Sequence, residues 1–177
     1  MYGATNQGNT LLIKHGIAED ESDYRLHVGF ANARAYVFPT EAARVVLSNG
    51  HQYERWEASQ PGTDLVTGAG YYVPWHDIQG CMEICIPKDT MVHAQLSRRE
   101  STSAKGRKAV QVAKELFERG MVHLPFQTKE ITSYDLQIKG TDLIIFSRLS
   151  IQVKCDYWCA KRGLAIQTHE CNPLRRF

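Results

Sequence analysis

The sequence predicts an α/β (α+β) protein, with a mainly β region in the first half and a core of element order αβββαβ in the second half. The first half contains short apolar or alternating runs separated by turn-forming residues, which is the pattern of short strands. The second half contains one long stretch with apolar residues at helical spacing, followed by further strand-like runs. These two patterns together predict the mixed fold class.

The first half is expected to hold several strands and one helix. The helix spans residues 40–48, because Thr40 suits the first cap, Ala and Val form an apolar side and Gly50 ends the pattern. A loop is expected over residues 59–70, where Pro and Gly are frequent. The expected strands are residues 11–17, 24–30, 34–38, 52–58, 71–75 and 82–87.

The second half begins with a polar stretch, residues 95–106, that is typical of a connector between regions. We therefore expect one region over residues 1–97 and another over residues 98–177. A helix follows over residues 103–119, since its apolar residues share one side and Gly120 terminates it. The later expected elements are strands at 121–126, 142–146 and 149–154, a short helix at 157–162 and a last strand at 164–168.

The two regions differ in charge, although the whole chain of 177 residues has a formal net charge of only +2. Residues 1–97 carry six basic and eleven acidic side chains, for a net charge of −5. Residues 98–177 carry fifteen basic and eight acidic side chains, for a net charge of +7. The basic region suits a polyanionic partner, and the alternative is that the two regions neutralise each other across an interface.

The ends and the cysteines bear on the compartment of the protein. The first residues lack the basic and apolar segments of a signal peptide, and no apolar run is as long as a membrane span. We therefore expect an intracellular protein (cytoplasmic, or in the nucleoid or host-cell interior) with no membrane partner. An odd number of cysteines, five, argues against a disulfide framework.

Four residues have the side-chain types of a structural zinc site: Cys155 and Cys159, followed by His169 and Cys171. Their spacing is not that of a standard zinc finger. A second pair, Cys81 and Cys85, is separated by three residues. The alternative is that these are ordinary buried cysteines, which behave as small apolar side chains.

The region with the most chemical information is a predicted hairpin over residues 140–154. Asp142 opens its first strand, and Gln152 and Lys154 lie two apart on the second, so they share a face. A loop of residues 147–149 would pair Asp142 with Lys154 and put all three polar groups on one side. A two-residue turn would place Asp142 on the other face, so the hypothesis depends on the register.

A carboxylate, an amide oxygen and an ammonium on one patch suit a site for Mg²⁺ or Mn²⁺. Asp142, the Gln152 amide oxygen and the Val153 carbonyl oxygen are candidate ligands, because these cations prefer oxygen. Lys154 would orient or deprotonate a water and offset charge on a phosphate, which is metal-assisted phosphodiester hydrolysis. The alternative is an ordinary amphipathic hairpin whose lysine faces solvent.

These residues resemble the PD-(D/E)XK nuclease superfamily, in the D…QxK variant similar to Mrr-like enzymes, over about residues 103–168. The resemblance implies a restriction-endonuclease-like αβββαβ core and metal-dependent cleavage of DNA. It also implies that Asp142 and Gln152 bind the metal and that Lys154 assists catalysis. Asp135 is a rival to Asp142 as the first acid, and we prefer Asp142 because its strand is longer.

The first helix of that family often supplies a Glu to the site. The expected position falls near Gln111 in this chain, and Glu115 lies about one turn later. Gln111 and Glu115 are therefore alternative members of the site.

Basic residues gather before and within the first turns of the same helix. Cations oppose the helix dipole there, so contact with the phosphates of DNA, or of RNA, would explain them. The alternative is a flexible basic connector. These residues are Arg98, Arg99, Lys105, Arg107 and Lys108.

We expect a metal-dependent deoxyribonuclease that forms a homodimer, since cutting both strands of a duplex favours two symmetric sites. The alternatives are a non-catalytic nucleic-acid- or protein-binding protein on a nuclease-like scaffold, and a small structural zinc protein.

Overall fold

The computed structural model of the protein describes most of the chain between residues 16 and 170. The described residues are 16–17, 20–48, 53–59, 62, 64, 66–94, 99–124, 134–136, 143–145, 149–156 and 162–170. The strand expected at 11–17, the helix expected at 157–162 and the start of the expected 142–146 strand therefore lie wholly or partly outside them.

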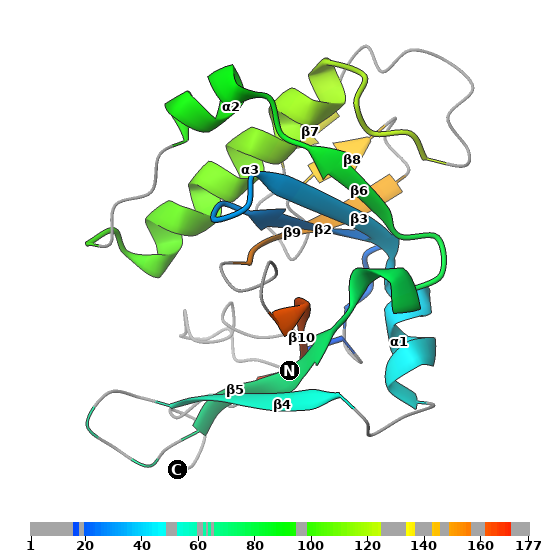
Figure 1. The fold of residues 1–177 in the computed structure, drawn as a ribbon, viewed down its shortest axis with the longest axis vertical. Coiled ribbons are helices and arrows are strands. Elements are labelled where there is room, and N and C mark those ends of the chain that lie inside the picture. The colour runs from blue at the N-terminus through cyan, green and yellow to red at the C-terminus, as the bar shows by residue number, and fades with distance from the viewer. Residues whose placement is uncertain are drawn as a thin grey trace.

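The described residues form a mixed α+β fold, as the sequence predicts, and their strands are arranged in two sheets (Figure 1). A six-stranded sheet has the order β6-β3-β2-β9-β8-β7, and a three-stranded sheet has the order β10-β5-β4. The strands are β2 (Tyr24–Gly29), β3 (Arg34–Pro39), β4 (Glu54–Ser59), β5 (Val66–Val73), β6 (Met82–Cys85), β7 (Tyr134–Leu136), β8 (Leu143–Ile145), β9 (Leu149–Cys155) and β10 (Leu164–Glu170). The helices are α1 (Thr40–Ser48), α2 (Lys88–His93), α3 (Thr102–Glu118) and the short 3₁₀ helix η2 (Trp75–Asp77).

The long helix α3 forms where its apolar stripe predicts it. The Ser101 hydroxyl caps its start by accepting a hydrogen bond from the Ala104 N–H (3.2 Å). At its end Gly120 has a φ of 66°, which a residue without a side chain adopts at little cost. The buried side chains of α3 are Ala109, Val112, Ala113, Leu116 and Phe117.

One face of the six-stranded sheet packs against α3 (Figure 1). Leu26 and Val28 of β2, Leu143 of β8, and Ile151 and Val153 of β9 belong to the same apolar core as the buried side of α3. Side chains alternate along a strand, so the residues between these point to the opposite face of the sheet.

The opposite face of the six-stranded sheet is covered by the second sheet and α1. Tyr36 and Phe38 of β3 pack with Val73 of β5 and with Leu164 and Ile166 of β10. Figure 1 accordingly places α3 and the β4–β5 strands on opposite sides of the larger sheet. The six-stranded sheet is therefore the middle layer.

The two halves of the chain share both sheets. β2 pairs with β9 in parallel, and β5 pairs with β10 in antiparallel fashion. The boundary expected at residue 97 therefore does not separate one sheet from the other. The parallel neighbour of β9 is β2, whereas β10, expected to close the core after β9, lies in the smaller sheet.

Three local expectations differ from the structure. Residues 121–124 are not a strand, although Val122 and Leu124 are buried against the α3 core. β5 begins at Val66, inside the expected loop, and α2 was not anticipated. Gly70 of β5 allows close packing, because a Cβ at this position would lie 2.0 Å from the Ile166 carbonyl oxygen.

No helix in the described part of the chain is long and apolar enough to cross a membrane.

Candidate functional site

The Gln-x-Lys segment lies on β9, inside the six-stranded sheet between β2 and β8. Ile151 and Val153 point into the α3 core, so Gln152 and Lys154 point to the opposite face. The structure thus brings Gln152 and Lys154 to one face, as the sequence predicts. Gln152 is only 6% exposed, and Lys154 is half-buried.

The register of the β8–β9 hairpin differs from the expected one. Leu143 pairs with Ile151 and Ile145 pairs with Leu149, whereas pairing Asp142 with Lys154 requires Leu143 to lie opposite Val153. The predicted register is therefore wrong by two residues, although a shift of two leaves each side chain on its own face. Asp142 itself lies outside the described residues.

Two buried polar residues of β2 lie directly beside the candidate residues. Arg25 is the register partner of Gln152, and His27 is the register partner of Lys154. Both β2 residues have 0% exposure, and their side chains share the face of Gln152 and Lys154. Sequence reasoning missed them; the available signal was polar residues at alternate positions of an otherwise apolar strand.

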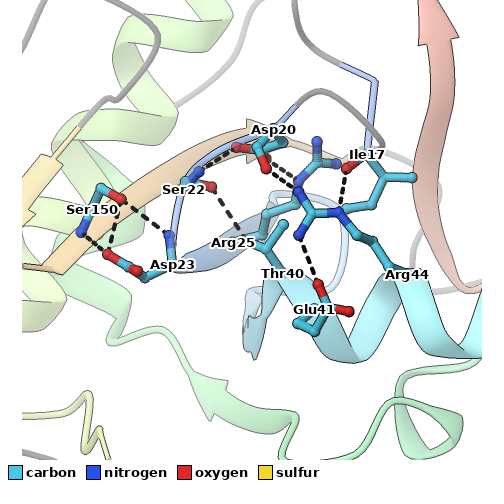
Figure 2. A network of polar contacts seen from close by, with 9 residues as sticks. All are labelled: Ile17, Asp20, Ser22, Asp23, Arg25, Thr40, Glu41, Arg44 and Ser150. Carbon is cyan, nitrogen blue, oxygen red and sulfur yellow. Dashed lines mark hydrogen bonds and ion pairs between the residues drawn. The ribbon is translucent and has the colours of Figure 1, made fainter.

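Arg25 is held by a polar network that the segment before β2 provides (Figure 2). Its Nε donates to Asp20 Oδ2 (2.6 Å), and Asp20 Oδ1 accepts from the Ser22 N–H (2.8 Å). Arg44 of α1 donates through Nε to the Ile17 carbonyl (2.9 Å) and through its other nitrogens to the Asp20 carbonyl and Glu41.

Burial lowers the pKa of Arg25, and the Asp20 carboxylate opposes that shift. Arg25 remains a guanidinium, because its ordinary pKa is very high. A positive charge therefore lies beside Gln152 and is neutralised by Asp20.

A second contact joins the starts of the two central strands, also visible in Figure 2. The Ser150 N–H donates to Asp23 Oδ2 (2.8 Å), and the Asp23 N–H donates to Ser150 Oγ (3.0 Å). This reciprocal pair aligns β2 with β9, which fixes Arg25 opposite Gln152.

His27 pairs with Asp156, the residue that follows β9. His27 Nδ1 lies 2.9 Å from Asp156 Oδ2, which also accepts from the Ala165 N–H of β10 (2.8 Å). The Asp156 N–H donates to the Val28 carbonyl (2.9 Å), so one aspartate connects β2, β9 and β10. Burial lowers the pKa of His27, while Asp156 opposes the shift. Burial thus favours the neutral imidazole, and in that form a proton on Nδ1 would donate to the carboxylate.

The start of α3 lies over the end of β9. Burial, with a further contribution from Asp156, raises the pKa of the Cys155 thiol to about 11, and the Lys105 ammonium opposes that rise. Cys155 packs on the α3 side of the sheet, whereas Lys154 points to the other face, so Lys105 and Lys154 lie on opposite sides of β9.

The other basic residues of this helix are placed as follows. Lys108 Nζ forms an ion pair with Glu100 (2.5 Å), and Arg107 donates to Ser103 Oγ (2.9 Å). Arg99 is exposed. Arg98 lies outside the described residues.

Gln111 and Glu115 lie on the part of α3 that is turned away from the sheet. The Gln111 amide donates to Glu115 Oε1 (3.3 Å), and the buried stripe of the helix faces the opposite way. Because α3 covers the Ile151 side of β9, the structure does not bring Gln111 or Glu115 together with Gln152.

Of the zinc candidates, Cys155 is a free, half-buried thiol on β9. Cys159, Cys171 and the side chain of His169 lie outside what the structure describes. Within the described residues, no group of three or more His, Cys, Asp or Glu side chains is placed to hold a metal ion. Asp135 lies on β7 opposite Ile144, two strands from β9.

No family model matches the chain, and no curated protein and no solved structure matches it. The resemblance of residues 103–168 to a nuclease core therefore depends only on Asp142, Gln152, Lys154 and the helix before them. Chemically, the face that carries Gln152 offers a side-chain amide, the Lys154 ammonium and a guanidinium neutralised by Asp20, and the amide and ammonium can donate hydrogen bonds to an anionic group.

Proposed function

We propose that the protein is a metal-dependent endonuclease that hydrolyses phosphodiester bonds of DNA. The observation that carries the proposal is the placement of Gln152 and Lys154 on one face of β9, with the Arg25 guanidinium beside Gln152. The half-buried Lys154 ammonium on that face suits contact with a phosphate group.

The order of elements supports the same proposal. α3 is followed by β7, β8 and β9, which pair in sequence order as antiparallel neighbours. Within the described residues a helix is followed by three strands, which is consistent with the start of the αβββαβ order that the resemblance implies, and Gln152 and Lys154 lie on the last of these three strands. In this protein β2 takes the parallel position beside β9.

Each candidate residue has a role in the proposed reaction. Asp142, the Gln152 amide oxygen and the Val153 carbonyl would hold Mg²⁺ or Mn²⁺, which would supply Lewis-acid activation of the phosphate. Lys154 would orient or deprotonate the attacking water. Gln152 contributes no negative charge, and Arg25 lies beside it, so we expect weaker metal affinity than a carboxylate at position 152 would give.

The test is cleavage of plasmid DNA with Mg²⁺ or Mn²⁺, repeated with a chelator. Lys154→Ala should abolish cutting, because it removes the proposed water-activating ammonium, and urea unfolding of the variant checks that it is folded under the assay conditions. Lys88→Ala, at an exposed lysine at the start of α2, is the control for loss of one positive charge. Undiminished cutting by the Lys154 variant would remove that residue from the mechanism.

A second candidate function is that of a non-catalytic nucleic-acid- or protein-binding protein on a nuclease-like scaffold. The burial of Gln152 beside Arg25 favours it, because a buried amide in a polar network is also a common structural feature. DNA binding without cutting, with either metal, would favour this candidate. A third candidate, a structural zinc protein, requires zinc in the purified protein.

A further inference from the structure

A buried carboxylate joins the smaller sheet to the larger one. Asp156, which follows β9, accepts at Oδ2 from the Ala165 N–H of β10 (2.8 Å), and the same oxygen lies 2.9 Å from His27 Nδ1 of β2. The Asp156 N–H donates to the Val28 carbonyl of β2 (2.9 Å). His27 is 0% exposed and Asp156 is 3% exposed, so this joint lies in the interior of the molecule.

The other nitrogen of the His27 ring has a different environment. Nε2 is buried and makes no hydrogen bond to any residue that the structure describes. The ring packs on Phe38, with the centroids 5.2 Å apart, and Phe38 belongs to the apolar cluster that contains Leu164 and Ile166 of β10. A proton added at Nε2 therefore puts a charged donor into apolar surroundings, which is costly while the two sheets stay packed together.

Most of the charged groups around His27 increase this cost. Arg25 of the same strand and Lys154, the register partner of His27 on β9, both disfavour a positive imidazole. Asp156 favours it, but burial outweighs that contribution, so the pKa of His27 is lowered. The other charged or titratable side chains described near this face come from β3, from α1 and from the segment before β2: Tyr36, Glu41, Arg44 and Asp20.

We propose that the His27–Asp156 pair is an acid-sensitive latch that holds the smaller sheet on the larger one. While His27 is neutral, its Nδ1–H and the Ala165 N–H share one carboxylate oxygen, and the two sheets stay joined. In acid the open form takes up a proton at Nε2 that the closed form resists. A fall in pH therefore raises the population in which β10 has left Asp156. Opening uncovers the sheet face that carries Gln152, and this inference does not depend on the proposed nuclease activity.

The decisive experiment is amide hydrogen exchange of the full chain, followed by NMR at several pH values and corrected for the intrinsic effect of pH on exchange. The Ala165 N–H reports the latch directly, and the amides of the β2–β3 ladder report unfolding of the larger sheet. We expect the Ala165 N–H to be less protected than the β2–β3 amides at every pH. Below pH 6.5, as long as the closed form keeps His27 neutral, its protection should fall about tenfold per pH unit.

His27→Gln keeps a side-chain donor for Asp156 and removes the titration, so the protection of the Ala165 N–H should no longer fall in acid. His123→Gln, at an exposed histidine after α3, is the matched control that should retain the fall. The wild-type chain gives a second measurement that needs no variant, because its His27 imidazole should titrate below 6.5. Equal protection of the Ala165 and β2–β3 amides, an acid fall that survives in the His27 variant, or a His27 pKa of 6.5 or higher would each overturn the proposal.

Discussion

The two faces of the six-stranded sheet are built from different kinds of side chain, although the same strands supply both. Toward α3 the central strands present Leu26, Val28, Ile151 and Val153, which need only shape and volume to pack. Toward the smaller sheet, the alternate positions on the same two strands carry Arg25, His27, Gln152 and Lys154.

The polar face carries an energetic cost that the apolar face does not. Burying a charge or an imidazole is unfavourable unless it is hydrogen-bonded, so Arg25 and His27 each need a dedicated carboxylate. Asp20 serves the first and Asp156 the second. The apolar face needs no such partners. The polar face is therefore the place where substitutions should reveal function as well as stability.

The largest effect should come from Asp20→Ala. Removing the carboxylate that neutralises a fully buried guanidinium should cost about 3–5 kcal/mol in the free energy of unfolding. Urea unfolding measures this cost. Asp89→Ala is the control, because it breaks the exposed pair with Arg119 and should change the free energy of unfolding little. Equal losses in the two variants would show that the buried Asp20–Arg25 pair stabilises the fold no more than the exposed pair does.

Leu116→Ala probes the apolar face. Leu116 is fully buried in the α3 core, so the substitution should cost about 3 kcal/mol through lost burial and a residual cavity. The same unfolding measurement applies, and the loss should not vary with pH. A pH-dependent loss would show that the apolar face is coupled to a titrating group.

His27 should have a smaller effect on the free energy of unfolding, and only at acidic pH. Its pKa is lowered by burial from 6.5, so above that pH both the folded and the unfolded chain keep it neutral. As pH falls below 6.5, the unfolded chain takes up a proton that the folded chain resists, and stability is lost. His27→Gln keeps a donor for Asp156 and should flatten this part of the pH profile. Identical profiles for both proteins would assign the acid loss to other groups.

Much of the secondary structure could be predicted from local pattern. The helix expected at 103–119 is α3 at Thr102–Glu118, and the strands expected at 24–30 and 34–38 are β2 and β3. Apolar spacing and terminating residues such as Gly120 act within a few residues, so they are visible in one sequence. The shared face of Gln152 and Lys154 follows from the same periodicity.

The surroundings of that face could not be predicted. Arg25 and His27 are distant in sequence from Gln152 and Lys154, and no local sequence pattern indicates that β2 pairs with β9. Glycine is frequent in loops, so Gly70 favoured a loop in the sequence analysis. In the structure a glycine is needed there because β10 approaches closely, and that contact joins distant segments. The hairpin register likewise depended on where the turn falls.

Local sequence patterns were enough to predict the long helix, several strands, the alternation that separates apolar from polar positions, and the charge difference between the two halves. The pairing of the two halves in both sheets, and the placement of Asp20 beside Arg25 and of Asp156 beside His27, depend on contacts between distant segments. The reason is the separation in sequence over which each interaction acts. Helical and strand patterns arise from neighbouring residues, whereas strand partners are selected by the free energy of burying all the faces at once.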